Sequence, residues 1–443
     1  MQPVHGTSVI PLAGPAFAGD RLAWAERVGT KAIRFLTAAP GRAPRVVDVW
    51  NAPTASPYSP APEIDTRLSA SATRLVIERR VVSPEFQFSV VAGPLKGPFR
   101  PVALCGEHPM RGIDVSGEAA IGREAPGCHG AAVLDLATGQ RTSLPGAERS
   151  ARIAGRYAAW FTDPVLQDSE YRADVVVWDW VANEELYRLP AMAFPSRLRS
   201  LSVQADGKVA VVYEDTPRNG HQIAERVGWA SPPEPYLHEL PLPVGDGSYY
   251  AVRLVGDQIV YLSGRPFYPE NAVQAATIGL IDLAGQSRTL GYPAYGRIDA
   301  DNFDFDGERV AWVRVGCRGA VIVDQSLADP PQIGKPRSGC RLQLARPLAV
   351  TGDDLLLGIA CRGFSDQCSL ANYSVVAESG RARVRLAHGI QQLNRRRVTV
   401  RLSMSLLRKL ARHRRWTARV RVKIVDPFVG QETRTGVVRL SGI

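Results

Sequence analysis

The stretch Gly19-Asp-Arg-Leu-Ala-Trp24, a turn glycine followed by a short apolar strand, decides the fold because seven similar stretches follow it in the 443-residue chain. The seven begin at Ala72, where alanine replaces the glycine, and at Gly117, Gly155, Gly207, Gly256, Gly307 and Gly352. The intervals between successive copies are 53, 45, 38, 52, 49, 51 and 45 residues. This is the size range of one four-stranded propeller blade, so the recurrence predicts an all-β β-propeller.

The physical basis of the repeat is local. Glycine supplies the positive φ that a tight turn between antiparallel strands requires, and the residues after it alternate between the two faces of the sheet. One four-stranded sheet cannot bury both faces, so neighbouring blades must pack together and the ring must close. Eight copies predict eight blades, or seven if one copy is degenerate, and residues 4–12 are candidates for the strand that closes the last blade. The fifth residue after the turn is bulky in seven copies: Trp24, Ile77, Trp160, Val212, Tyr261, Trp312 and Leu357.

An aspartate follows two apolar residues in the next strand of four repeats. Asp135, Asp179, Asp282 and, in a weaker match, Asp324 occupy this position. A turn with glycine follows in several of them, and the aspartate side chain readily accepts hydrogen bonds from the backbone two residues on. We therefore predict turn-supporting aspartates rather than a catalytic array.

The repeats resemble those of the TolB-like and WD-repeat-like propellers of secreted bacterial proteins, and the resemblance covers residues 1 to about 379. It implies a propeller domain over residues 1–379 that acts as a binding platform, although several propellers of this kind host enzymes. The rest of the chain, residues 380–443, is predicted to be a separate small domain.

The charge of the chain is concentrated in this last segment. Residues 381–443 contain 17 Arg and Lys against Asp426 and Glu432, a net of +15, whereas the whole chain carries +11. Basic and apolar residues alternate with period two in residues 381–386, 397–402 and 419–424, which predicts strands with one packed and one cationic face. Residues 405–413 read as a capped amphipathic helix that turns leucines inward.

The segment 425–433 resembles the turn of bacterial immunoglobulin-like domains, which implies a small β-sandwich over residues 380–443. Arginine at this density can bind cell-wall polymers, acidic lipids or nucleic acid, while the alternative is a solvated sheet face in an arginine-rich protein. Too few aromatic residues are present for a base-stacking platform, so no specific nucleic-acid binding is expected. The predicted polyanion-binding residues are Arg395, Arg396, Arg397, Arg412, Arg414 and Arg415.

Six cysteines fall into three local couples: Cys105 with Cys128, Cys317 with Cys340, and Cys361 with Cys368. An even number grouped in this way predicts disulfides and an oxidising compartment. Six cysteines permit 15 pairings, so the connectivity stays open. The first couple, with His108 and His129, also suggests zinc, and the aspartates at 299–306 suggest calcium, but neither spacing fits a common site. No metal or cofactor is therefore predicted.

Three long connections, residues 161–173, 215–235 and 263–276, each follow the second strand of a blade and are predicted to project from one face of the propeller. Loops placed in this way build ligand surfaces. Their aromatic and polar residues suit a protein or glycan ligand, although long loops are often only solvent-exposed connections. The candidate ligand-binding residues are Tyr171, His221, Trp229, Arg265, Phe267 and Tyr268.

These features favour a non-catalytic extracellular or envelope-associated binding or scaffolding protein, expected to be monomeric. The alternative is a propeller enzyme, a lyase or hydrolase, whose acidic and histidine residues converge on the central channel from different blades. No serine-nucleophile, phosphate-loop or dinucleotide motif is present, and no catalytic residue is predicted. Residues 1–20 lack a signal-peptide pattern, so export is inferred from the cysteines. A cell-wall polymer or anionic envelope surface is the expected partner of the basic segment.

Overall fold

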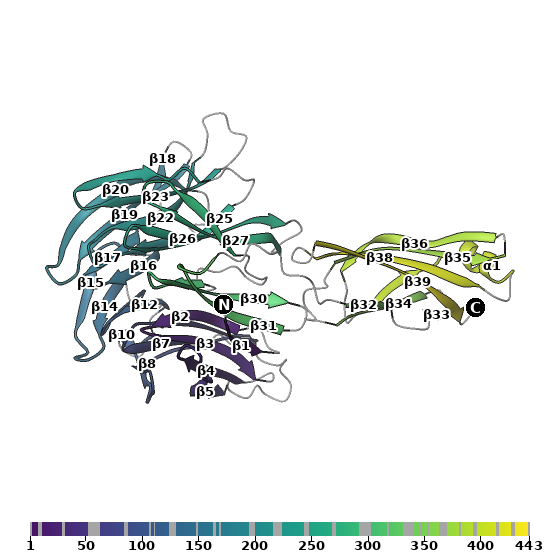
Figure 1. Cartoon of the computed structure of the whole chain (residues 1–443), viewed down its shortest axis with the longest axis horizontal. Coiled ribbons are helices and arrows are strands. Elements are labelled where there is room, and N and C mark those ends of the chain that lie inside the picture. Colours follow the sequence, from purple (N-terminus) through teal and green to yellow (C-terminus); the bar gives the residue numbers. More distant parts are fainter. Residues whose placement is uncertain are drawn as a thin grey trace. The chain divides into compact units, whose positions relative to one another are not determined.

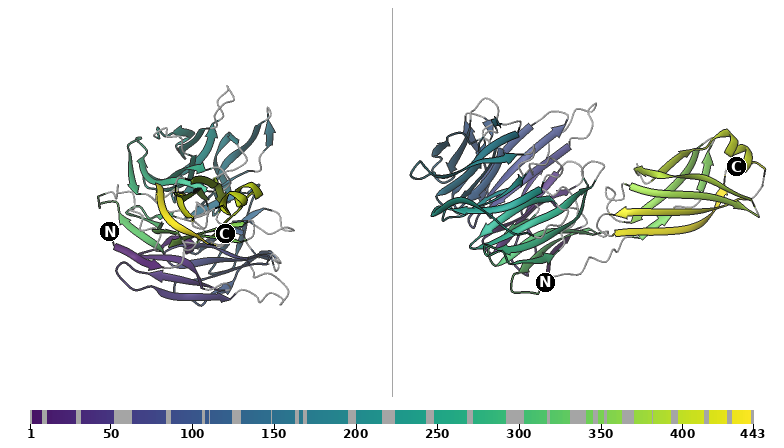
Figure 2. Two further views of the ribbon diagram at one scale, coloured as in Figure 1. Left: turned by 90° about the vertical axis from the view of Figure 1, so that its right-hand side faces the viewer. Right: turned by 90° about the horizontal axis from the view of Figure 1, so that it is seen from above.

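The computed structural model describes residues 2–7, 11–28, 32–51, 63–83, 87–105, 108–109, 111–123, 130–147, 149–162, 165–167, 170–194, 200–215, 224–242, 248–267, 272–291, 303–316, 319–330, 341–344, 348–351, 354–362, 370–380, 382–392, 397–412, 416–426 and 430–441. The chain forms two compact units (Figures 1 and 2). The first comprises residues 1–314 and 320–333, and the second residues 315–319 and 334–443. Each is described separately below.

The described part of the first unit contains seven antiparallel sheets with four main strands each, numbered here as blades 1 to 7. Blade 1 consists of β2 (Pro11–Ala18), β3 (Arg21–Val28), β4 (Ala32–Ala38) and β5 (Arg45–Asn51). Blade 2 consists of β6 (Glu63–Ala70), β7 (Arg74–Ser83), β8 (Gln87–Pro94) and β9 (Arg100–Pro101). Blade 3 consists of β12 (Arg111–Ser116), β13 (Ala119–Arg123), β14 (Ala131–Asp135) and β15 (Arg141–Leu144). Between blades 2 and 3 lies a short ribbon of β10 (Ala103–Cys105) and β11 (His108–Pro109).

Blade 4 carries a fifth, short strand, and blade 7 takes its outer strand from the start of the chain. Blade 4 consists of β16 (Arg149–Ala154), β17 (Tyr157–Phe161), β19 (Glu170–Asp179) and β20 (Glu184–Phe194), and its fifth strand β18 (Val165–Gln167) pairs with β19. Blade 5 consists of β21 (Leu201–Val203), β22 (Val209–Asp215), β23 (Ala224–Ser231) and β24 (Glu234–Glu239). Blade 6 consists of β25 (Ser248–Val255), β26 (Gln258–Phe267), β27 (Ala272–Asp282) and β28 (Ser287–Gly291). Blade 7 consists of β29 (Phe303–Phe305), β30 (Arg309–Gly316), β31 (Gly319–Ser326) and β1 (Gln2–Thr7).

The first strand of the chain completes the last blade. β1 pairs antiparallel with β31, in a register that runs from Gln2 opposite Asp324 to Thr7 opposite Ala320, and the two strands lie side by side in Figure 1. Closure by an N-terminal outer strand was predicted for residues 4–12. The structure confirms it with a strand placed slightly earlier, at residues 2–7.

The seven sheets form a closed ring. The innermost strand of each blade contacts that of the next, from β2 through β6, β12, β16, β21 and β25 to β29, and β29 contacts β2 again. The described core divides into seven clusters of buried residues, one between each pair of adjacent blades. This arrangement confirms that the blades bury one another's faces, as the repeat predicts.

The repeated turn behaves as predicted from its residues. Gly19, for example, has φ +64° and Gly307 has φ +101°, values that side chains rarely tolerate. The tryptophans at the fifth position, Trp24, Trp160 and Trp312, are almost fully buried between blades. The seven-blade alternative is the one realised.

Three of the four strand-end aspartates take their predicted role, whereas Asp324, the weaker match, contacts Arg309 at 3.5 Å instead of holding a turn. Asp135 Oδ1 accepts hydrogen bonds from the backbone N–H groups of Ala137 and Thr138, and Asp179 Oδ1 accepts from those of Val181 and Ala182. The amides of Thr138 and Ala137 lower the pKa of Asp135, because they stabilise its charged form. These carboxylates therefore hold turns.

The eighth copy of the repeat lies in the second unit, which corrects the prediction of eight blades. Its strands β33 (Leu348–Thr351) and β34 (Asp354–Arg362) form a hairpin, but β34 pairs with β37 (Arg397–Arg401), and β33 runs parallel to β39 (Gly430–Ser441). The domain boundary predicted after residue 379 must therefore move to near residue 334. Gly380 is in fact the turn of a hairpin between β35 (Leu370–Ser379) and β36 (Ala382–Gln392).

The second unit also contains β32 (Arg341–Leu344), which pairs with β34, and β38 (Thr417–Asp426), which lies between β35 and β39. The predicted helix is α1 (Met404–Leu410), with Ser403 as its N-cap and Leu410 fully buried. Leu410 accepts a hydrogen bond from the indole of Trp416 at 2.8 Å. Among the described residues, no helix could traverse a lipid bilayer.

Candidate functional site

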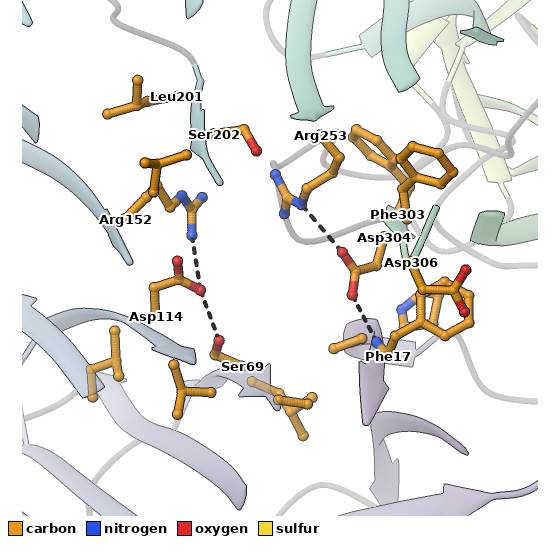
Figure 3. Close-up of a pocket in the computed structure, with 18 of the residues that line it drawn as sticks. Phe17, Ser69, Asp114, Arg152, Leu201, Ser202, Arg253, Phe303, Asp304 and Asp306 are labelled. Atoms are coloured by element: carbon orange, nitrogen blue, oxygen red, sulfur yellow. Dashed lines mark hydrogen bonds and ion pairs between the residues drawn. The ribbon is translucent and has the colours of Figure 1, made fainter. Parts of the chain in front are cut away.

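A cavity of about 340 Å³ lies at the centre of the propeller. Its walls come from the innermost strands of all seven blades, β2, β6, β12, β16, β21, β25 and β29, with residues of the adjoining turns (Figure 3). A volume in this range is typical of small-molecule sites. The ring therefore encloses the first candidate site.

One residue from each blade faces this cavity at an equivalent position. In six blades it stands three residues before the repeated turn residue, and in blade 5, whose turn is longer, it stands five before. Its strand neighbours, such as Ile153 and Leu254, are buried between blades because side chains alternate along a strand. We call this set the belt; in blade order it is Ala16, Ser69, Asp114, Arg152, Ser202, Arg253 and Asp304.

The charged belt residues form two pairs, each between adjacent blades. Arg152 of blade 4 approaches Asp114 of blade 3 with 3.9 Å between Nη1 and Oδ1, and Arg253 of blade 6 approaches Asp304 of blade 7 with 3.4 Å between Nε and Oδ1. About a fifth of each of these side chains remains exposed. The belt is thus neutral overall but carries local charges that face the cavity.

Both carboxylates also bind the backbone of neighbouring blades. Asp114 accepts hydrogen bonds from Ser69 Oγ at 3.1 Å and from the N–H of Ile153 at 3.1 Å, which joins blades 2, 3 and 4. Asp304 Oδ2 accepts from the N–H of Phe17 at 2.7 Å, which joins blade 7 to blade 1. These contacts stabilise the ring.

Asp304 has an unusual electrostatic environment. Desolvation raises its pKa above the ordinary value, and this effect outweighs the charge of Arg253 and the hydrogen bonds from the N–H groups of Phe17 and Phe305. The negative charge of Asp114 raises the pKa further. The two belt carboxylates therefore interact electrostatically.

Ser202 contributes a comparable inter-blade bond in blade 5. Its Oγ accepts a hydrogen bond from the N–H of Leu254 in blade 6 at 3.0 Å. Two residues further on, the side chain of Gln204 exchanges two hydrogen bonds with the backbone of Gly256, at 2.9 Å and 2.7 Å. A repeat alignment centred on the turn glycine would have revealed the belt as a mostly polar column, but the shifted spacing in blade 5 obscures it.

The described residues of the predicted ligand loops lie largely in extended strands. Tyr171 lies in β19, and Arg265 and Phe267 lie in β26, whose hairpin with β27 continues to residue 267. Trp229 does not project from a loop as predicted. It lies in β23, packs against the core between blades 5 and 6, and stacks on His238 with ring centroids 4.2 Å apart. His221 and Tyr268 lie outside the described residues.

Two cysteines lie on described strands, Cys105 in β10 and Cys361 in β34, whereas Cys128, Cys317, Cys340 and Cys368 lie outside the described residues. The disulfide prediction therefore stays a prediction. At the former calcium candidate, Asp306 Oδ1 accepts hydrogen bonds from the N–H groups of Glu308 and Arg309, as expected of a turn. Across the described ranges, no three His, Cys, Asp or Glu residues are placed to hold a metal.

The exposed face of one sheet in the second unit is the second candidate site. In β38, Arg419 and Arg421 are exposed while Ala418 and Val420 are buried, which confirms the predicted alternation. β36 presents further arginines, and the register places them beside these two, because Val376 of β35 lies opposite both Arg385 and Arg419. We call Arg383, Arg385, Arg419 and Arg421 the basic face.

One described carboxylate lies among these arginines. Glu378 contacts Arg383 at 3.5 Å and Arg419 at 3.4 Å, so the five residues carry a net charge of +3. Of the polyanion-binding residues predicted from sequence, Arg412 is exposed after α1, and Arg397 lies in β37. Arg395, Arg396, Arg414 and Arg415 lie outside the described residues.

Comparison with known proteins finds similar solved structures but no family. No protein-family model matches the chain, and no curated protein matches it. The β-propeller domain of the Trilobed protease from Pyrococcus furiosus is similar, with 12% identity and a TM-score of 0.47 over 75% of this chain and 99% of that one. The C-terminal WD40 domain of Sif2 gives 10% identity and a TM-score of 0.43 over 73% and 85%.

The tricorn protease gives 10% identity and a TM-score of 0.46 over 74% of this chain. This chain spans about a third, 34%, of the tricorn protease chain that it matches. The β-propeller fold of this chain rests on its own closed ring of four-stranded sheets. The fold by itself leaves the function open.

Proposed function

We propose that the protein is a non-catalytic binding protein that attaches to anionic polymers of the cell envelope through the basic face. The observation that carries the proposal is the set of four exposed arginines on two strands that flank β35, with Glu378 as the nearby carboxylate. Strands are about 4.8 Å apart and same-face residues about 6.8 Å apart, so the arginines form a flat array about 10 Å wide.

A flat array of this kind suits a polymer with repeated negative charges better than a small anion. A single exposed ion pair contributes little, about 0.2–1 kcal/mol, so useful affinity requires several contacts at once. The packed undersides of β36 and β38, Leu386 and Val420 among them, hold the array in place. A wall polymer with repeated phosphates, or an anionic envelope surface, provides the complementary spacing of charge.

The enzyme hypothesis finds one supporting feature, since carboxylates of different blades do converge at the central channel. Asp114 and Asp304 are, however, bound to backbone N–H groups and paired with arginines, which suits a structural role better than proton transfer. We therefore favour binding. A protein or glycan ligand on the propeller and an extracellular or envelope location are part of the same proposal.

The test uses the full chain and immobilised long-chain polyphosphate, with orthophosphate as the monomeric competitor. The variant R385Q/R419Q/R421Q removes three charges from the basic face, and the control R42Q/R45Q/R100Q removes three exposed arginines from the propeller. We expect the first to weaken binding about 3- to 160-fold at low salt, from about 0.2–1 kcal/mol for each of the lost contacts.

The salt dependence gives a second readout. For nucleic acids, each lost contact with a phosphate lowers the slope of log K against log salt by about 0.7–0.9. The slope of the basic-face variant, which lacks three arginines, should therefore be smaller by about 2. Equal affinity and equal slope in the basic-face variant and the propeller control would refute attachment through this face.

A further inference from the structure

We propose that the central cavity binds a small organic carboxylate between Arg152 and Arg253. The two side chains come from blades 4 and 6 and extend into the cavity toward one another, with Ser202 of blade 5 between them (Figure 3). Two guanidinium groups that converge on one space form a strong site for a carboxylate, because each presents a planar fork of N–H donors. The site is independent of the basic face.

The internal pairing of Arg152 is incomplete. Its approach to Asp114, at 3.9 Å, is longer than a hydrogen bond, and within the described structure its buried Nε has no hydrogen-bond partner. A buried donor without an acceptor is costly, and native structures usually supply a partner from the protein, water or a ligand. The accessible part of the Arg152 guanidinium group, rather than Nε, is what a carboxylate in the cavity would contact.

The charges of the belt balance overall, but the arginines and the aspartates are separated in space. Asp114 is also bound by Ser69 and by the N–H of Ile153, and Asp304 by the N–H of Phe17, so both carboxylates are held on the blades beside the arginines. The cationic wall therefore spans blades 4 to 6, with Asp114 and Asp304 at its two ends. This polarity favours an anionic group near Ser202.

The remaining walls combine polar and apolar groups. Leu68, Leu201 and Phe303 line the cavity together with the polar belt, so apolar side chains back a lining that is mostly polar. The side chains of Arg152 and Arg253 are 21% and 17% exposed, so solvent reaches the guanidinium groups. A carboxylate with a short hydrocarbon body fits these walls.

The test is isothermal titration of the full chain with succinate and with acetate, beside sulfate and orthophosphate, in a buffer of low ionic strength. We expect saturable binding of succinate with a Kd near or below about 1 mM, and weaker binding of the inorganic anions. R152Q should weaken succinate binding at least about tenfold, the cost of one charge-assisted hydrogen bond. The control R188Q, in which the lost arginine pairs with Glu185 and Asp174 outside the cavity, should bind like the native protein.

Two further variants keep the test decisive if R152Q unfolds. R152K retains the charge without the fork and should bind with intermediate affinity. D114N removes the carboxylate that competes for Arg152 and should tighten succinate binding about threefold or more, an effect that a purely structural role would not produce. Absence of succinate and acetate binding in the native protein, unchanged binding in R152Q, or unchanged binding in D114N would each overturn the proposal.

Discussion

Asp304 offers a sharp test of how the ring is held closed. Its carboxylate joins three blades, through the N–H of Phe17 in blade 1 at 2.7 Å and Arg253 in blade 6 at 3.4 Å. D304A leaves the amide of the buried Phe17 without this acceptor, which costs about 1–3 kcal/mol. It also leaves Arg253 without this partner, a smaller cost because that side chain is partly hydrated.

The expected loss for D304A is therefore about 2–4 kcal/mol in the free energy of unfolding. Unfolding entropy near 2.1 cal/mol/K per residue converts this into a fall of about 3–6 °C in the melting temperature of the propeller unit. Urea unfolding, followed by the fluorescence of the buried Trp24, Trp160 and Trp312, measures the loss of unfolding free energy. The control is D257A, whose carboxylate is 78% exposed and should contribute less than about 1 kcal/mol.

D304N separates the hydrogen bond from the charge. Asparagine keeps an oxygen for the Phe17 amide, so its cost at neutral pH should be small. Because burial raises the pKa of Asp304 from 3.8, the native fold binds this proton more tightly than the unfolded chain does. The native protein therefore loses stability, relative to D304N, as pH rises from about 3.8 to the raised pKa, and the difference is constant above it.

Two results would refute this reasoning. If D304A is as stable as D257A, the bond from blade 7 to blade 1 contributes nothing. If D304N gains no stability relative to the native protein across that pH interval, burial does not dominate the electrostatics of Asp304.

Three other predictions follow from the same structure. G279A should destabilise the propeller by about 1–3 kcal/mol, because a Cβ at this position overlaps the ring of Tyr261, and adding Y261L should restore much of the loss in thermal unfolding. Y187F should cost about 0.5–1.5 kcal/mol, because the Tyr187 hydroxyl donates to the carbonyls of Gly207 and Ala230. Desolvation also raises the pKa of this tyrosine above 10, so native stability should fall relative to Y187F as pH rises past 10, and an identical alkaline profile would contradict the assignment. Thiol titration of the denatured, unreduced protein should find no free sulfhydryl, whereas six would exclude the predicted disulfides and the argument for export.

The propeller was predictable because its signal is local and repeated. Gly19 and Trp24, five residues apart, define both a turn and a buried position, and the same spacing recurs in most of the blades. The copy at Gly352 was misassigned for the same reason. A hairpin such as β33–β34 has one local chemistry whether its neighbours are propeller blades or, as here, β37 and β39, and those neighbours are distant in sequence.

The belt was not predictable by the same route. Asp114, Arg152, Arg253 and Asp304 each look like an ordinary polar residue next to a turn, and only ring closure brings them to one cavity. The basic face, by contrast, followed from period-two alternation within single strands, as at Arg419 and Arg421. Properties of one strand can be read from sequence, whereas properties of a ring require knowing which strands meet.

The junction of blades 7 and 1 shows what ring closure requires. These two blades come from opposite ends of the unit, so β1 on β31 outside and Asp304 with Phe17 inside must hold them together. Arg309 of blade 7 adds a third contact, with its guanidinium 4.8 Å from the ring centroid of Phe17 and in hydrogen-bond contact with the carbonyl of Gly19 at 3.3 Å. Strand pairing, a buried carboxylate and an arginine over an aromatic ring thus meet at one interface. Because closing a ring between distant chain segments costs conformational entropy, polar bonds concentrated at this junction help to offset that cost where it arises.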